Sequence, residues 1–259
     1  MKKVLFFFSA LSMVLISSCS SDDSSTDTAS ATLLPTKITE TTVENGKSGS
    51  LVYTLTYDGN KLKDIATTDA SRTVYTYTGD VITKVELYRS SILYSTDVYA
   101  YEGGKLVSRI TTREANKTTQ SKLTLVYNAN GTITTKSSSI ENKIETQYDG
   151  TTTYTFSNGN LVSTEYADGT KEKVTSTFDD KKSPFTNITG VKLLLDLDDN
   201  FDFSSVNNTV TNTTVDYDSN GKVVETATVT TTNKYNGSNF LTEASAGDAK
   251  DSFKLEIAY

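Results

Sequence analysis

The sequence predicts an all-β protein, in which up-and-down antiparallel hairpin repeats form one large curved sheet or barrel-like shell. Three observations predict this fold. The chain is rich in threonine, contains 15 tyrosines, and has only 2 prolines in 259 residues, a composition typical of strands. Apolar and polar residues alternate with a period of two. A short phrase, an aromatic-ended run followed by a glycine turn and an aliphatic residue, recurs along the chain.

Residues 1–18 have the composition of an export signal. Two lysines precede the 13-residue run VLFFFSALSMVLI. This run is too short and wrongly flanked for a spanning helix. It resembles a bacterial lipoprotein signal, in which small residues precede an obligatory cysteine, and the resemblance implies that Cys19 is the lipid attachment site. An ordinary secretory peptide with an incidental cysteine is the alternative.

Residues 19–37 are expected to form a lipidated, flexible tether. The run SSDDSSTDTASAT after Cys19 is small, polar or acidic, and has nothing to bury. Its first residues resemble the export signal of Bacteroidota lipoproteins displayed on the cell surface; a soluble spacer is the alternative reading. We therefore expect a protein of the outer membrane, lipid-anchored and facing the cell exterior.

The composition excludes several classes of function. Without residues 1–18 the chain carries 23 basic and 32 acidic residues, a net charge of −9, which argues against nucleic acid as a partner. It then has no histidine, methionine or tryptophan, and its single cysteine is the lipidated one. Disulfides, thiol nucleophiles and imidazole chemistry are therefore excluded. We expect no catalytic residues, no cofactor and no metal, and hence no enzyme.

Residues 38–259 are expected to form a single β-hairpin-repeat domain. In LVYTLTYDG, the apolar residues Leu51, Tyr53, Leu55 and Tyr57 share one face of a strand. After each turn an aliphatic or aromatic residue returns five or six positions beyond the aromatic one, so that the two would meet across the hairpin. The pairs are Tyr57/Leu62, Tyr77/Ile82, Tyr101/Leu106, Tyr127/Ile133, Phe156/Leu161, Tyr217/Val223 and Tyr235/Phe240.

A non-repeat insertion spans residues 179–208. It loses the alternation, and its VKLLLDL run fits either a short helix or a buried strand. A shell of more than about ten strands has a lumen too wide for side chains alone to fill. We therefore expect the insertion to pack against or into the shell.

The repeats also carry a resemblance. The Y-D-x-x-G-x-L units look like tyrosine-aspartate repeats of the RHS type. Together with FDDKKSPF and the later Asn207 and Asn208, they resemble a family of Bacteroidota lipoproteins with a porin-like β fold. The resemblance implies a fold and a compartment, but no activity. Thr78, Glu102, Asn128, Ser157 and Asn236 stand where the repeat has aspartate, which argues against a shared ligand at these positions.

Two groups of residues are candidate binding sites. Asp196, Asp198, Asn200 and Asp202 have the spacing of the first four calcium-loop ligands, but Phe201 and Asn207 stand where such a loop has glycine and glutamate. A solvated acidic loop is therefore preferred over a metal site. Tyr88 and Tyr94 lie outside the repeat phrase and are candidates for an exposed binding surface.

The alternating C-terminal residues Phe253, Leu255, Ile257 and Tyr259 resemble the closing strand of a membrane-spanning barrel. The second face of the expected strands carries threonine, lysine and glutamate, so a water-facing sheet is preferred. We expect a non-catalytic, membrane-anchored surface lipoprotein, a β scaffold for adhesion or for binding a glycan or protein ligand. The alternative is a polysaccharide-acting hydrolase or glycan-binding accessory protein of the cell envelope.

Overall fold

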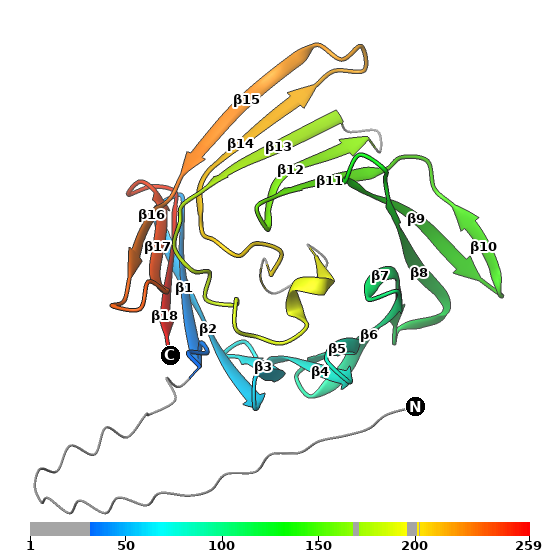
Figure 1. The fold of residues 1–259 in the computed structure, drawn as a ribbon, viewed down its shortest axis with the longest axis horizontal. Helices are drawn as coiled ribbons and strands as arrows, with labels where there is room; N and C mark the ends of the chain where they lie inside the picture. Colours follow the sequence, from blue (N-terminus) through cyan, green and yellow to red (C-terminus); the bar gives the residue numbers. More distant parts are fainter. Residues whose placement is uncertain (1–31, 168–170, 196–200, 202) are drawn as a thin grey trace, which may run out of the picture. The chain divides into compact units, whose positions relative to one another are not determined.

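The computed structural model describes residues 32–167, 171–195, 201 and 203–259, and the chain from Thr32 to Tyr259 forms one compact unit. The strands of this unit join in a single antiparallel sheet of 18 strands, which curls into a nearly closed barrel-like shell (Figure 1). This confirms the predicted all-β architecture. None of the described helical segments is long and apolar enough to cross a membrane.

The first half of the sheet is a meander of long hairpins. Its strands are β1 (Lys37–Glu44), β2 (Lys47–Asp58), β3 (Lys61–Thr67), β4 (Ser71–Thr78), β5 (Val81–Arg89), β6 (Ile92–Glu102), β7 (Lys105–Arg113), β8 (Asn116–Tyr127) and β9 (Ile133–Glu141).

The second half contains the one long connection without strands. Its elements are β10 (Ile144–Gln147), β11 (Thr152–Ser157), β12 (Asn160–Ala167), β13 (Lys171–Phe178), the 3-10 helix η1 (Val191–Leu194), β14 (Thr209–Tyr217), β15 (Val223–Thr230), β16 (Thr232–Tyr235), β17 (Leu241–Gly247) and β18 (Ser252–Ala258).

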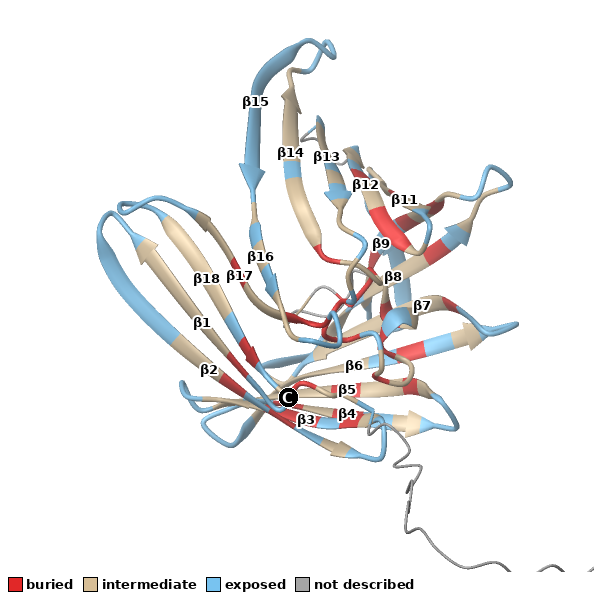
Figure 2. Ribbon diagram, turned by 60° about the vertical axis from the view of Figure 1, so that its left-hand side comes forward, coloured by how far each residue is buried: buried red, intermediate tan, exposed pale blue. Residues whose placement is uncertain are grey.

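Apart from β10 and β11 and from β15 and β16, strands that are neighbours in sequence pair with each other, and β18 pairs with β1. β9 pairs with both β10 and β11. One place interrupts the ring: β15 pairs with β14, whereas β16, which begins one residue after Thr231, pairs with β17. We call the break between β15 and β17 the seam. Figure 2 shows the sheet parting there.

The repeat phrase produces the predicted hairpins. Six of the seven predicted partners lie directly opposite each other, from Tyr57 and Leu62 to Tyr217 and Val223. The pair Tyr235/Phe240 is wrong, because Tyr235 lies opposite Leu241. Asn236 Oδ1 accepts hydrogen bonds from the N–H groups of Ser238 and Phe240, both at 3.0 Å, and this turn is one residue longer than predicted.

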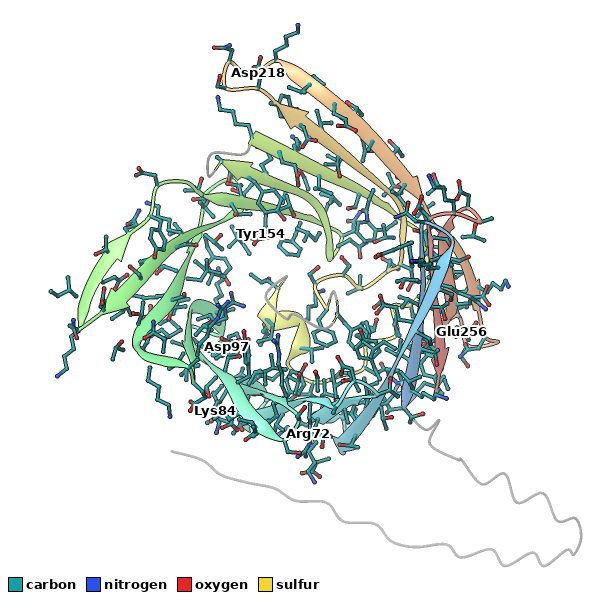
Figure 3. All side chains as sticks on the ribbon, turned by 180° about the vertical axis from the view of Figure 1, so that it is seen from behind. Arg72, Lys84, Asp97, Tyr154, Asp218 and Glu256 are labelled. Atoms are coloured by element: carbon teal, nitrogen blue, oxygen red, sulfur yellow. The ribbon has the colours of Figure 1, made fainter. Side chains whose placement is uncertain are left out.

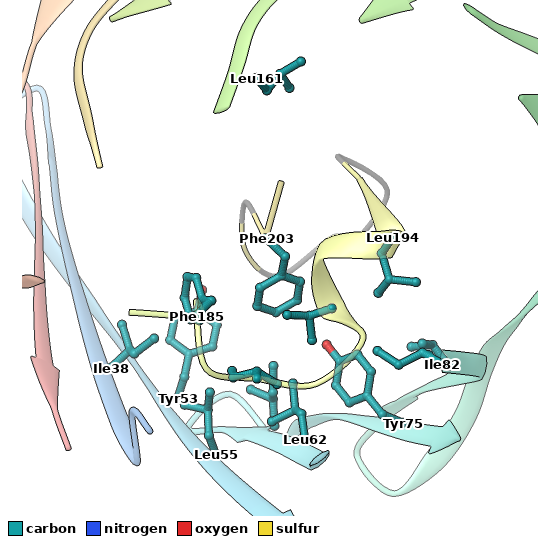
Figure 4. Packing of buried hydrophobic residues seen from close by; sticks show 14 of the residues in the cluster. Ile38, Tyr53, Leu55, Leu62, Tyr75, Ile82, Leu161, Phe185, Leu194 and Phe203 are labelled. Carbon is teal, nitrogen blue, oxygen red and sulfur yellow. The ribbon is translucent and has the colours of Figure 1, made fainter. Parts of the chain in front are cut away.

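The described residues of the insertion, 179–195, 201 and 203–208, lie inside the curve of the sheet, and we call them the plug. Phe185, Ile188, Val191, Leu194 and Phe203 of the plug form one apolar cluster with inward residues of the strands (Figure 4). The expected packing of the insertion into the shell is thereby confirmed. The VKLLLDL run begins as the single turn of η1, not as a strand.

Residues 33–37, the last residues of the expected tether, are held against the shell. Tyr57 donates its hydroxyl hydrogen to Pro35 O at 2.6 Å, and Asn187 Nδ2 of the plug donates to Leu33 O at 2.9 Å. Lys37 already belongs to β1. Residues 33–37 therefore belong to the shell, at the end where the plug lies, although the sequence predicted a flexible tether up to residue 37.

Candidate functional site

The plug is tied to the hairpin turns at one end of the shell. Thr189 donates its N–H to Asn60 O at 2.9 Å, and Tyr77 donates its hydroxyl hydrogen to Thr189 O at 3.0 Å. On the opposite side, Asn160 Oδ1 accepts the N–H groups of Val206 and Asn207, both at 3.0 Å. These bonds join turns that are about 100 residues apart in the chain, so the plug braces that end of the shell.

Asp179 connects the plug to the strands beside the seam. Its Oδ1 accepts the N–H groups of Lys181, at 2.9 Å, and of Asn208, at 3.2 Å. Its Oδ2 accepts the hydroxyl hydrogen of Tyr235 and an amide hydrogen of Asn233 at 3.4 Å. Burial, followed by the hydrogen bond to Asp179, raises the pKa of Tyr235 to about 12. Through Oδ1, Asp179 holds Lys181 near the beginning of the plug against Asn208 at its end.

A cavity of about 230 Å³ lies at the base of the seam. Its apolar walls come from the plug, with Phe185 and Phe201, and from β17 and β18, with Ala244, Phe253 and Leu255. Its third wall consists of Asn212 on β14, Val229 on β15, Thr231 between β15 and β16, and Asn233 on β16. The cavity is larger than the roughly 150 Å³ apolar cavity that binds benzene, so it can hold one large apolar side chain.

One polar atom in the cavity wall lacks a partner. Asn233 Nδ2 donates to Thr209 O at 3.0 Å, but the buried Oδ1 of Asn233 accepts no hydrogen bond from any residue that the structure describes. A buried acceptor without a donor is uncommon and costs stability. An occupant of the cavity with an N–H or O–H group could satisfy it. None of the described residues that line the cavity is acidic.

The outer wall of the shell is charged. On β18 the apolar residues Leu255 and Ile257 face the core, and Lys254 and Glu256 alternate with them. Lys254 lies 2.9 Å from Glu256, and Lys84 lies 3.0 Å from Glu86, as nitrogen-to-oxygen distances. Figure 3 shows Arg72, Lys84 and Glu256 on the outside of the ring and Tyr154 within it. A lipid-facing wall would have the opposite arrangement.

Of the candidate site residues from the sequence, the structure describes Tyr88 and Tyr94. The lipid attachment residue Cys19 lies outside the described residues, as does the acidic run Asp196, Asp198, Asn200 and Asp202. Lipid attachment at Cys19 and the preference for a solvated acidic loop over a calcium site therefore stay predictions.

Tyr88 and Tyr94 lie on neighbouring strands, and both are half-buried. Tyr88 lies opposite Arg72, and the guanidinium of Arg89 lies 3.8 Å from the centre of the Tyr94 ring. One face of the Tyr94 ring is therefore already covered, which weakens the hypothesis that these tyrosines form an open stacking surface.

The cavity could not be predicted from the sequence. Its lining comes from segments separated by up to about 200 residues, and no motif links Val229 or Asn233 to the plug. A weak signal existed at β15, where VVETATVT places valine on both faces and so departs from the usual alternation.

No protein-family model matches the chain, and no curated protein matches its sequence. The fold is similar to the crystal structure of a porin-like protein from Bacteroides uniformis ATCC 8492, with a TM-score of 0.51, 12% sequence identity, and coverage of 86% of this chain and 96% of that chain. A porin-like protein from Bacteroides vulgatus ATCC 8482 matches with a TM-score of 0.42, 10% identity, and coverage of 88% and 98%. The first similarity bears out the porin-like β fold that the sequence resemblance implied, and it concerns the fold alone.

Proposed function

We propose that the protein is a non-catalytic lipoprotein of the outer membrane, anchored through Cys19 and displayed toward the cell exterior, whose β shell binds a protein or glycan ligand. The shell works in water, and the acyl chains at Cys19 hold it to the membrane. A single acyl chain anchors only marginally, whereas the several chains of a lipoprotein hold firmly.

One observation carries the proposal: strands such as β18 and β5 place apolar residues inward and charged residues outward. On β18 this puts Leu255 and Ile257 in the core and Lys254 and Glu256 on the outer wall. Lysine and glutamate on the lipid face of a spanning barrel are strongly unfavourable. A water-facing shell therefore fits the side chains better than a membrane pore, and a lipid anchor then supplies the membrane contact.

The interior supports binding rather than hydrolysis. Glycoside hydrolysis needs two carboxyl groups flanking the scissile bond, and the described lining of the seam cavity contains none. The plug fills the space beside β3 to β5 with aromatic and aliphatic side chains (Figure 4). What remains at the seam is an apolar cavity edged by asparagine and threonine, which suits a bound ligand.

The anchor is tested by feeding cells a radiolabelled fatty acid and isolating the full-length protein and its Cys19→Ala variant. The proposal expects label only on the protein that retains Cys19. Protease added to intact cells should cleave the lipidated protein if it is displayed outside. A chain of residues 20–259 that remains insoluble without detergent would overturn the water-facing shell.

A further inference from the structure

Strand β15 has an open edge. It pairs with β14 along its length, and it is in register with no other described strand, because β16 pairs with β17. The N–H of Thr231 donates to Val210 O of β14 at 2.8 Å. Because successive residues of a strand direct their backbone groups to opposite sides, the N–H and C=O groups of Thr226, Thr228 and Thr230 point into the seam.

Apart from a bulge at its start, opposite Tyr217, this edge lacks the usual protection. All eight residues of β15 are exposed, as the uniformly pale strand in Figure 2 shows, with Val223 at 50% and Val224 at 68% exposure. Natural proteins protect sheet edges with lysine, proline, bulges or short strands. The stretch VVETATVT has no proline and no lysine, and Glu225 is its single charge. Such an edge is a template for a further strand.

The features beside the edge define what that strand must carry. Val229 lines the apolar cavity at the base of the seam, and Glu225 lies on the same face of β15, four residues away. Glu225 is directly opposite Asp216, which is directly opposite Glu172, so three carboxylates stand in a row across three strands. None of them forms a salt bridge with a described residue.

Like charges directly opposite in a sheet destabilise it. A basic side chain beside Glu225 would relieve this repulsion, and an apolar side chain beside Val229 would enter the cavity. The recognition mode is strand addition, in which main-chain hydrogen bonds supply affinity and pockets for alternate side chains supply specificity.

We propose that an extended segment of a partner protein adds to β15 as an antiparallel strand in the seam. Its inward side chains are a large apolar residue opposite Val229, a small or β-branched residue opposite Ala227 and a lysine or arginine opposite Glu225. The inference rests on the proposed function as a binding shell and names the ligand as a peptide strand. Antiparallel addition continues the pairing of the rest of the sheet.

A second copy of the chain fits the edge less well. Pairing β15 with itself about Thr226 would place Glu225 opposite Ala227 and would bring two rows of acidic residues together. The full sequence already carries a net charge of −7, and the repulsion between the two rows would oppose such a dimer. A basic peptide removes the same repulsion instead of doubling it.

The test uses the unlipidated chain of residues 20–259 and a fluorescent peptide, TFTVTKT, blocked at both ends. In the proposed register, its phenylalanine lies opposite Val229 and its lysine opposite Glu225. Fluorescence anisotropy should show saturable binding, and the peptide TFTVTET should bind at least about tenfold more weakly. Equal binding of the two peptides, or no binding of either, would overturn the proposal.

Two variants locate the binding. Thr228→Pro removes an N–H that points into the seam and leaves the bonds to β14, so the variant should fold and lose the peptide. Thr228→Val is its matched control and should bind normally. Glu225→Lys should reverse the preference in favour of TFTVTET, whereas Glu256→Lys on the outer wall of β18 should not.

The readouts separate this inference from the proposed function. Peptide binding to the soluble chain does not depend on Cys19, and fatty-acid labelling does not depend on β15. A concentration-dependent dimer that Thr228→Pro abolishes, with no peptide binding, would assign the edge to a second copy and contradict the inference. Circular dichroism of each variant confirms that a loss of binding is not a loss of fold.

Discussion

The hairpins of β2 to β8 and the hairpin of β14 and β15 are built on the same phrase but have different surroundings. In the first region, Leu62, Ile82 and Leu106 are each 0% exposed. In the second, Tyr217 lies opposite Val223, which is 50% exposed. The phrase therefore specifies the hairpin, and the neighbouring structure decides whether the hairpin is buried.

Tyrosine hydroxyls link the hairpins of the first region to one another. Tyr101 donates to Ile82 O at 2.8 Å and Tyr127 to Leu106 O at 3.0 Å, so each repeat is bonded to the one before it. Tyr259 bonds to Leu241 O in the same way, at 2.7 Å. The Tyr217 hydroxyl has no such partner among the described residues. A buried ring whose hydroxyl has a hydrogen-bond partner suits tyrosine at positions 101, 127 and 259.

The largest expected effect concerns the plug. Phe203 is 2% exposed, and its ring lies 4.9 Å from that of Phe185, edge to face. Phe203→Ala should lower the free energy of unfolding by about 3–5 kcal/mol. Val224→Ala, on the exposed β15, should change it by less than about 0.5 kcal/mol. Urea denaturation measures both, and similar losses would mean that the two regions are equally buried.

Gly190 of the plug and Gly221 of the β14–β15 turn allow a matched test of the two regions, because both have a φ of 79°. A Cβ at Gly190 would lie 2.6 Å from Asp80 O, whereas a Cβ at Gly221 would meet nothing within 4 Å. Both alanine variants incur the backbone cost of about 1–2 kcal/mol. Gly190→Ala should be further destabilised by the displacement of the plug from the β4–β5 turn. Equal melting temperatures of the two variants would show that the plug does not press on this turn.

The hydroxyl bonds between repeats should have a smaller effect. Tyr101→Phe leaves Ile82 O without its donor and should cost about 1–1.5 kcal/mol. Tyr217→Phe is the matched substitution in the open region and should be close to neutral. Thermal unfolding of the two variants measures the difference. If Tyr217→Phe costs as much as Tyr101→Phe, the hydroxyls do not distinguish the regions.

The smallest effect concerns alkaline pH. Burial raises the pKa of Tyr77 to about 12, and it also raises the pKa values of Tyr57, Tyr101 and Tyr259 above the ordinary 10.0. Their contribution is fully present below pH 10 and is lost as the pH rises from 10 through the folded-state values, because only the unfolded chain ionises there. Between pH 9 and 11, the free energy of unfolding of Tyr101→Phe should therefore fall less than that of the wild type. The difference should be at most about 1 kcal/mol, as measured by urea denaturation. A steeper loss in the variant would contradict this assignment.

The hairpins could be predicted from the sequence because their information is local. An aromatic residue, a glycine turn and an aliphatic residue at a fixed distance specify both the strand pair and its register, as at Tyr57 and Leu62. The Tyr235 pair failed because the Asn236 side chain lengthens the turn by hydrogen bonds that spacing alone does not reveal.

The candidate site could not be predicted, because its information is not local. The cavity forms where β15 and β17 separate and the plug lies beneath them, and the Asp179 hydrogen bonds that fix this arrangement span up to 56 residues. The second edge of β15 is likewise unpaired because β16 pairs with β17 and not with β15. The alternation of residues within β15 does not carry that information.

Hydrogen exchange on the chain of residues 20–259 tests the contrast between the two regions most directly. We expect slow exchange for the hydrogen-bonded amides of β4 and β5, which lie between paired strands, and fast exchange at Thr226, Thr228 and Thr230 of β15. Protection of those three amides in the monomer, equal to that of β4 and β5, would show that the seam is closed and would contradict this difference between the regions.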